Sequence, residues 1–268
     1  MAEELARFAG AAENAARKAG AYLASKFGSF DTRTIREKRR NDFVSEVDRE
    51  SERLITTCLR EQFPDHQILG EEGGQQSGNS DYRWIVDPLD GTTNFIRNIP
   101  FFCVSIALYQ GKTALTGVVF NPQTNELFAA TLGQGATLNG QPLSVSAETD
   151  FSRAFLATGF PHQRKRQLPL YSAAFNDIFY HSAGMRRIGS AALDLCYVAA
   201  GRFEAFWELG LNPWDIAAGS LILSEAAGQV SDFRGGDTFL ESGFVVASNG
   251  KIHKNLLHHL SPYFGSDQ

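Results

Sequence analysis

The chain has 268 residues, of which 43% are hydrophobic and 21% are charged, and its formal net charge is −5. This length suits one large domain or two moderate ones with a sizeable core. The negative charge argues against a general nucleic-acid binder, and no apolar run approaches the length of a membrane span. The N-terminus MAEELARF begins with charged residues rather than a signal peptide, so the cytoplasm is the expected location.

The first third of the chain predicts two helices. Residues 2–27 place apolar side chains at helical spacing, which indicates an amphipathic helix ending near Gly28. A basic cluster follows at residues 36–40 and includes Lys38; a solvated face is the favoured interpretation, with guidance of an anionic substrate as the alternative. Ser45 opens the second predicted helix, where Asp48 has the position of the acidic member of a capping box.

A short strand is predicted from Gln67 to Leu69, ending in Gly70, Glu71 and Glu72. The Gly/Ser-rich stretch 73–80 that follows is interpreted as a linker or, preferably, as a mobile flap over a site. Glu72 is ambiguous, because adjacent strand residues point to opposite faces and it is expected either beside the site or exposed.

Strands and turns dominate the middle of the chain, whereas strands and helices alternate afterwards. Strand patterns at 103–109, 113–120 and 127–131, with a hairpin at Asn139-Gly140, predict an antiparallel sheet. Further strands are predicted at 155–158, 185–188, 205–207, 229–231 and 244–247, and helices at 169–181, 191–200, 213–227 and 251–260. This alternation indicates helices layered against a second sheet.

The three cysteines, Cys58, Cys103 and Cys196, lie far apart in apolar surroundings without a CxxC spacing. This pattern fits reduced, buried thiols better than disulfides or a zinc site.

The most informative stretch is WIVDPLDGTTNF, residues 84–95. Its apolar start predicts a strand, and Pro88 keeps Asp87 extended while leaving a main-chain carbonyl free near Leu89, which is expected in a turn. Asp90 with the following Gly-Thr-Thr predicts an N-cap and first helical turn. Such a helix start attracts phosphate, which the neighbouring carboxylates would repel unless cations lay between them, so a Mg²⁺-dependent phosphatase site is predicted. The alternative is a plain turn leading into a helix.

WIVDPLDGTTNF resembles the signature of the inositol monophosphatase family of Mg²⁺-dependent, lithium-sensitive phosphatases. ILGEEGG (68–74) and NDFVSEVD (41–48) resemble upstream family segments, and WELGLNPWDIAAG (207–219) resembles the second family signature. The resemblance covers nearly the whole chain, with four motifs in the right order. It implies an α/β (α+β) fold of layers α-β-α-β-α, with an N-terminal lobe of residues 1–145 and a C-terminal lobe of residues 146–268.

The resemblance also implies two or three Mg²⁺ ions per site. Glu71, Asp87 and the Leu89 carbonyl would hold one ion, and Asp87, Asp90 and Asp215 the second. Asp87 is the sensible bridge, because two neighbouring cations need a shared charge that screens their repulsion. Without the signature, a first-turn acid such as Asp215 would be interpreted only as a helix stabiliser.

Further roles are implied by the same resemblance. The group that orients and deprotonates the metal-bound water would be Thr92 with Glu71 and Asp48. Glu208 is expected to accept hydrogen bonds from substrate hydroxyls. The expected substrate-binding residues are Asp90, Gly91, Thr92, Thr93, Gly189, Ser190, Ala191, Glu208 and Asp215.

The expected substrate is myo-inositol 1-phosphate or a related sugar or polyol phosphate. Members that hydrolyse phosphoadenosine phosphate tend toward DGTKxF and those for histidinol phosphate toward DGTRxF, whereas this chain has Thr93 and Asn94. Those substrates and fructose 1,6-bisphosphate remain the alternatives. Family habit implies a homodimer, and some bacterial members act as accessory factors in transcription complexes, so an association with RNA polymerase is a further alternative. No basic, aromatic RNA-binding face is evident.

Overall fold

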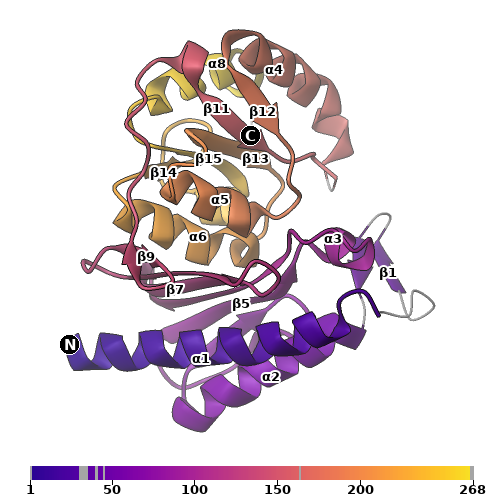
Figure 1. Ribbon diagram of the computed structural model, residues 1–268, viewed down its shortest axis with the longest axis vertical. Coiled ribbons are helices and arrows are strands. Elements are labelled where there is room, and N and C mark those ends of the chain that lie inside the picture. The colour runs from indigo at the N-terminus through magenta and orange to yellow at the C-terminus, as the bar shows by residue number, and fades with distance from the viewer. Residues whose placement is uncertain (1, 30–35, 40–41, 45, 163, 266–268) are drawn as a thin grey trace.

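The computed structural model describes residues 2–29, 36–39, 42–44, 46–162 and 164–265, and it has five layers (Figure 1). From one outer face to the other these are α1 (Ala2–Lys26) with α2 (Glu46–Gln62), a large sheet, α5 (Ala191–Ala199) with α6 (Pro213–Glu225), a smaller sheet, and α4 (Leu168–His181) with α8 (His253–Phe264). The predicted α-β-α-β-α layering is therefore confirmed.

The large sheet has the strand order β10-β9-β8-β7-β6-β5-β3-β4. Its strands are β3 (Gln67–Gly70), β4 (Gly74–Gln76), β5 (Tyr82–Asp90), β6 (Cys103–Gln110), β7 (Thr113–Asn121), β8 (Glu126–Thr131), β9 (Ala136–Leu138) and β10 (Gln141–Pro142). β3 and β5 run parallel, and the other neighbours are antiparallel. The register of β5 against β6 shifts between Asp87 and Asp90, so the motif lies on a bulge that redirects its side chains.

The smaller sheet has the order β12-β11-β13-β15-β14. Its strands are β11 (Phe155–Thr158), β12 (Gly184–Arg186), β13 (Ala205–Leu209), β14 (Gln229–Ser231) and β15 (Phe244–Ser248). β11 is parallel to both of its neighbours, and the remaining pairs are antiparallel. The predicted helix and strand alternation is confirmed, with helix and strand ends that differ from prediction by a few residues.

Some short elements were not predicted. They are the hairpin of β1 (Arg36–Arg39) and β2 (Asp42–Val44), the edge strand β4, and α7 (Phe239–Ser242). β4 lies inside the stretch predicted to be a flap, and it pairs with β3 through residues 74–76. Its sequence GQQ has no apolar alternation, so nothing in the sequence indicated a strand. The pairing depends on main-chain hydrogen bonds rather than on buried side chains.

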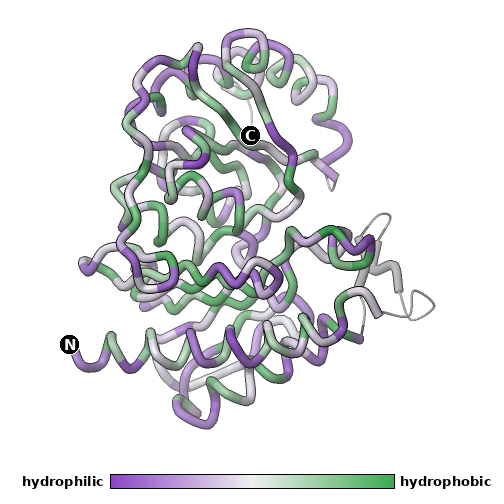
Figure 2. Tube along the Cα trace, viewed as in Figure 1, coloured by the Kyte–Doolittle hydropathy of each residue, from purple (hydrophilic) through white to green (hydrophobic). Residues whose placement is uncertain are grey.

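Three hydrophobic cores lie between the layers. The first joins α1 and α2 to the large sheet, the second surrounds α5 and α6 between the two sheets, and the third joins the smaller sheet to α4 and α8. Figure 2 shows hydrophilic and hydrophobic residues alternating along α1, as expected for a helix with one buried face. All three cysteines are buried and unpaired, which confirms their prediction as core thiols.

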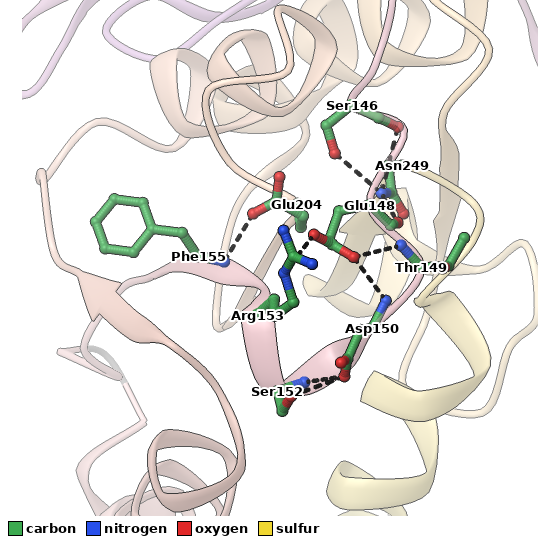
Figure 3. Close-up of polar contacts among 9 residues, drawn as sticks. All are labelled: Ser146, Glu148, Thr149, Asp150, Ser152, Arg153, Phe155, Glu204 and Asn249. Carbon is green, nitrogen blue, oxygen red and sulfur yellow. Dashed lines mark hydrogen bonds and ion pairs between the residues drawn. The ribbon is translucent and has the colours of Figure 1, made fainter.

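The segment that links the two sheets is held by polar contacts (Figure 3). Asn249 donates to the carbonyls of Ser146 and Glu148, at 3.4 and 2.8 Å. The Glu148 carboxylate accepts from two consecutive amides and pairs with Arg153 at 3.1 Å. β10 ends at Pro142 and β11 begins at Phe155, and the division into lobes at residues 145 and 146 stays a prediction.

No helix in the described part of the chain is both long enough and apolar enough to cross a membrane.

Candidate active site

The centre of the site is the C-terminal end of β5. Asp87 is almost fully buried, and its Oδ1 accepts from the Leu89 amide at 3.0 Å. Asp90 is the last residue of this strand, and α3 (Thr92–Ile96) begins after Gly91, which is the N-cap with φ 91°. The prediction that Asp90 caps this helix is therefore wrong, as is the placement of Leu89 in a turn, because the bulged strand continues through the motif.

Asp90 instead binds the start of a helix from the other half of the chain. Its Oδ2 accepts from the Ser190 hydroxyl at 2.6 Å and from the Ala192 amide at 2.8 Å. Ser190 is the N-cap of α5 and also accepts from the Leu193 amide at 3.4 Å. A carboxylate at a helix N-terminus is stabilised by unpaired amides and by the helix dipole. The motif of β5 is thus bound directly to the start of α5.

Glu71 reaches the site from the turn after β3. That strand ends at Gly70, so Glu71 and Glu72 lie in the β3–β4 turn and not on a strand as predicted. The Glu71 amide donates to the Val86 carbonyl at 3.2 Å, which places the turn beside β5. Glu72 does not lie on the opposite face of a strand. Its main-chain amide donates to the Glu52 carboxylate at 2.8 Å, and this hydrogen bond holds Glu72 in the turn.

Glu52, on α2, was not identified from sequence. Its buried carboxylate accepts from the amides of Glu72 and Gly73, at 2.8 and 2.7 Å. A Cβ on Gly70 or Gly73 would lie 2.6 or 2.5 Å from a Glu52 carboxylate oxygen, so both glycines make room for it. The only signal in the sequence was an acidic residue four positions after Asp48 on the same predicted helix.

Asp215 enters from α6, as predicted. It is the third residue of the helix, and its Oδ2 accepts from the Asn212 amide at 2.7 Å in a capping box. The helix-stabilising role and the position beside Asp87 and Asp90 therefore coexist in one side chain.

Burial and mutual repulsion dominate the electrostatics of this carboxylate cluster, defined as Glu71, Asp87, Asp90 and Asp215. Burial, then Glu71, Asp90 and Asp215, raise the pKa of Asp87 well above its ordinary value. Burial and Asp90 similarly raise the pKa of Asp215. Burial raises the pKa of Asp90 to about 6, against the opposing effect of the Ser190 and Ala192 hydrogen bonds. Acids that come this close destabilise one another as anions.

Asp48 and Thr92 are in contact, as the resemblance implied. The Thr92 hydroxyl lies 3.1 Å from Asp48 Oδ1 and 3.1 Å from the Leu89 carbonyl oxygen. Asp48 is buried on α2, and Ser51 on the same helix donates to the Pro88 carbonyl at 2.8 Å. Helix α2 therefore packs against the motif and holds it through Asp48 and Ser51. The predictions for Ser45, Asn41 and Lys38 are not tested. Residues 41 and 45 lie outside the described residues, and only the backbone of Lys38 is described.

Asn94 lies on α3 and joins the motif to the segment that precedes α5. Its side-chain amide donates to the carbonyls of Phe101 and Ile188, at 2.7 and 2.9 Å. A Cβ on Gly91 would lie 2.9 Å from the Phe101 carbonyl oxygen, so no larger residue fits there at φ 91°. Gly189 and Ser190 are thereby brought beside Gly91, while Thr93 is exposed and Ala191 is buried in the first turn of α5.

Glu208 lies on β13, next to the carboxylate cluster. Burial, then Asp215, raise the pKa of Glu208 to about 8, and Arg187 opposes the shift. The Glu208 carboxyl lies against the backbone of Gly159, where any Cβ would collide with it. Arg187 was not identified from sequence; it is exposed, lies over the Phe160 ring at 5.3 Å and contacts His162 at 3.0 Å.

The donor set fits hard divalent cations. Carboxylate and carbonyl oxygens are the ligands that Mg²⁺ and Ca²⁺ prefer, and the four clustered carboxylates come from three separate elements around one bulge. Like charges that raise one another's pKa in a buried site are stabilised when a cation lies between them.

The protein is a layered α/β protein with a buried carboxylate cluster at a bulged strand end. The chain matches the inositol monophosphatase family over residues 4–263, and it belongs to that family. "Nus factor SuhB" of Pseudomonas aeruginosa is 47% identical over 255 residues, covering 93% of this chain and 94% of the relative.

Solved structures agree with this assignment. The structure of extragenic suppressor protein suhB from Bartonella henselae superposes with a TM-score of 0.91 at 40% identity, covering 94% of this chain and 97% of that one. Inositol monophosphatase from Anabaena (Nostoc) sp. PCC 7120 superposes with a TM-score of 0.87 at 37% identity, covering 97% of both chains.

Proposed function

We propose that this protein is a Mg²⁺-dependent phosphomonoesterase that hydrolyses myo-inositol 1-phosphate or a related sugar or polyol phosphate. The observation that carries the proposal is the convergence of Glu71, Asp87, Asp90 and Asp215 on the bulged end of β5. The similarity to the Anabaena inositol monophosphatase supports the choice of substrate class. The absence of the Lys or Arg that follows DGT in other subgroups supports it too.

In this proposal, Glu71, Asp87 and the Leu89 carbonyl hold one cation, while Asp87, Asp90 and Asp215 hold another. Bound Mg²⁺ would supply an activated water and stabilise the charge that develops on the phosphoryl and leaving oxygens.

The protein's own groups have complementary tasks. The Thr92 hydroxyl donates to Asp48 at 3.1 Å, so that its oxygen can orient the attacking water while the carboxylate of Glu71 or Asp48 accepts the proton. Gly91, Thr92 and Thr93 would bind the phosphate. Glu208 would accept hydrogen bonds from the hydroxyls of the polyol, with Gly189, Ser190 and Ala191 forming the adjacent wall.

The test is a panel of phosphate esters, each assayed with and without Mg²⁺. Inositol 1-phosphate, fructose 1,6-bisphosphate, 3′-phosphoadenosine 5′-phosphate and histidinol phosphate represent the candidate classes. We expect turnover of inositol 1-phosphate with the highest kcat/KM, and loss of turnover after chelation. A preference for any of the other three would reassign the substrate class, and turnover without a divalent ion would overturn the metal-dependent proposal.

A second role follows from the relatives named Nus factor SuhB. We propose that the protein also takes part in transcription complexes. This role would be additional to catalysis and would not replace it, because the carboxylate cluster is complete. A pull-down with RNA polymerase tests this role. The Asp87→Asn variant should be captured as well as the wild type, whereas failure to capture the wild type would contradict the role.

A homodimer, expected from the family, is testable by light scattering.

A further inference from the structure

A second group of metal-binding side chains lies outside the carboxylate cluster, where α4 packs against α8. Asp177 and His181 are four residues apart on α4, so they lie on the same face of that helix. His259 meets them from α8. One ligand atom of each residue lies within 4.8 Å of those of the other two, so two helices contribute to one group.

The Asp177 carboxylate contacts both imidazoles, whose ring centroids lie 4.9 Å apart. Its Oδ1 is 3.2 Å from His181 Nδ1, and its Oδ2 is 3.0 Å from His259 Nδ1. Within the described residues, the ion pairs of Asp177 are made with these two histidines. No lysine or arginine in that part of the chain therefore competes for the carboxylate.

The two rings differ in freedom. His259 is stacked on Phe151, with centroids 4.9 Å apart and planes inclined by 17°, so its orientation is fixed by packing. The His181 side chain is 48% exposed, and its Nδ1 also lies 2.9 Å from the Asp177 main-chain oxygen. One ring of the group is therefore held by packing and the other lies at the surface, where an ion can reach it.

We propose that Asp177, His181 and His259 bind a transition-metal ion of the Zn²⁺ class, with water in the remaining position. Zn²⁺ takes imidazole nitrogen and carboxylate oxygen at about 2.0–2.2 Å, so its ligand atoms lie at most about 4.4 Å apart. The ligand atoms of this group lie within 4.8 Å of one another, close to that limit. Imidazole ligands favour Zn²⁺, Ni²⁺ or Cu²⁺ over Mg²⁺, so this site and the carboxylate cluster select different ions.

Such an ion would fasten α8 to α4. Only the folded chain brings residues 177, 181 and 259 together, so binding stabilises the folded state. Protons compete for the imidazole nitrogens, so binding weakens as the pH falls. The alternative is a purely hydrogen-bonded group that binds no ion.

The experiment adds ZnCl₂ to the full chain in excess Mg²⁺, so that the carboxylate cluster is already occupied. Calorimetry gives the affinity, and the melting temperature gives the stabilisation. The variants are His181→Ala and His259→Ala, with His258→Ala, an exposed neighbour outside the group, as the matched control. We expect at least about tenfold weaker Zn²⁺ binding in both test variants, a smaller Zn²⁺-dependent rise in melting temperature, and a wild-type response in the control.

X-ray absorption spectroscopy at the zinc K edge identifies the ligands. Scattering from two imidazole ligands in the wild type, and loss of the scattering from one of them in His181→Ala, would support the site. Equal Zn²⁺ affinity in wild type and His181→Ala, or a shell of oxygen ligands alone, would overturn it. If His259→Ala fails to fold, the half-exposed His181 still provides the test. Turnover with Mg²⁺ should be unchanged in His181→Ala, so this result is separate from the phosphatase proposal.

Discussion

The Ser190 hydroxyl donates a 2.6 Å hydrogen bond to Asp90 across a separation of 100 residues. The same hydroxyl is the N-cap of α5, so one contact joins the bulged end of β5 to the helix that lies between the two sheets. β5 and α5 are therefore joined at Asp90, a residue proposed to hold a cation.

Ser190→Ala should weaken both the fold and the site. It removes a hydrogen bond to a charged group together with an N-cap, a loss of about 1.5–3 kcal/mol of unfolding free energy. The Mg²⁺ concentration needed for half-maximal turnover should rise, because Asp90 loses an orienting donor. Ser152→Ala is the matched control, since Ser152 also binds a carboxylate, that of Asp150, in the exposed 3-10 helix Phe151–Arg153. Equal effects of the two variants would show that Ser190 does not support the site.

Asp87→Asn should abolish phosphatase turnover and leave the fold intact. The substitution removes a charge that Glu71, Asp90 and Asp215 repel, so the metal-free protein should be at least as stable as the wild type. The measurements are turnover of inositol 1-phosphate and thermal unfolding in a chelator. Near-normal turnover by the folded variant would end the assignment of Asp87 as the bridging ligand.

Glu208→Gln should discriminate between substrates. A cation beside Asp215 would offset the charge that helps to raise the pKa of Glu208 to about 8, and the ionised carboxylate would then accept hydrogen bonds from the polyol. A hydrogen bond to a charged group contributes roughly 1.5–3 kcal/mol, so kcat/KM for inositol 1-phosphate should fall about tenfold to a hundredfold.

p-Nitrophenyl phosphate is the control substrate, because it lacks ring hydroxyls, and its kcat/KM should change far less. Gly159→Ala should mimic the substitution, since its Cβ would displace the Glu208 carboxyl. Equal losses on both esters would mean that Glu208 supports the carboxylate cluster instead.

Glu52→Gln should raise the Mg²⁺ requirement more than it lowers maximal turnover. The two oxygens of the Glu52 carboxylate each accept from one amide of the turn that carries Glu71, whereas Gln has a single acceptor oxygen and would turn its NH₂ group toward the other amide. An increase of about tenfold in half-saturating Mg²⁺ is expected. Glu50→Gln is the control on the same helix, where the side chain pairs with Arg53 at the surface. Similar behaviour of the two variants would exclude a positioning role for Glu52.

The buried His253 should make stability depend on pH. Its two ring nitrogens contact the hydroxyls of Ser231 and Ser248, at 2.8 and 2.9 Å. Burial lowers the pKa of His253 to about 4, from an ordinary 6.5. The unfolded chain therefore binds the proton more readily, and the contribution of neutral His253 is complete above pH 6.5 and lost as the pH falls toward 4.

This loss amounts to about 3 kcal/mol in unfolding free energy. Urea unfolding at pH 7 and pH 4.5 measures it, with His253→Gln as the comparison. The variant should lose less stability than the wild type between the two pH values, and an identical loss would contradict the assignment to His253.

The sequence by itself determined the local parts of this protein. Apolar periodicity and turn residues predicted nearly all of the helices and strands, because those patterns depend on neighbours within a few residues. The motifs also identified the four carboxylates before any geometry was known. Pairings without a hydrophobic pattern were missed, such as the main-chain pairing of β4 with β3.

Only the tertiary structure decided which distant groups meet. Asp90 was predicted to cap the helix next to it in sequence, yet the bulge in β5 turns its carboxylate toward α5. Glu52 received no functional prediction, because its partners are main-chain amides 20 and 21 residues away. His259 lies 82 residues from Asp177. Such contacts follow from sheet register and helix packing, which bring together side chains that no local pattern connects.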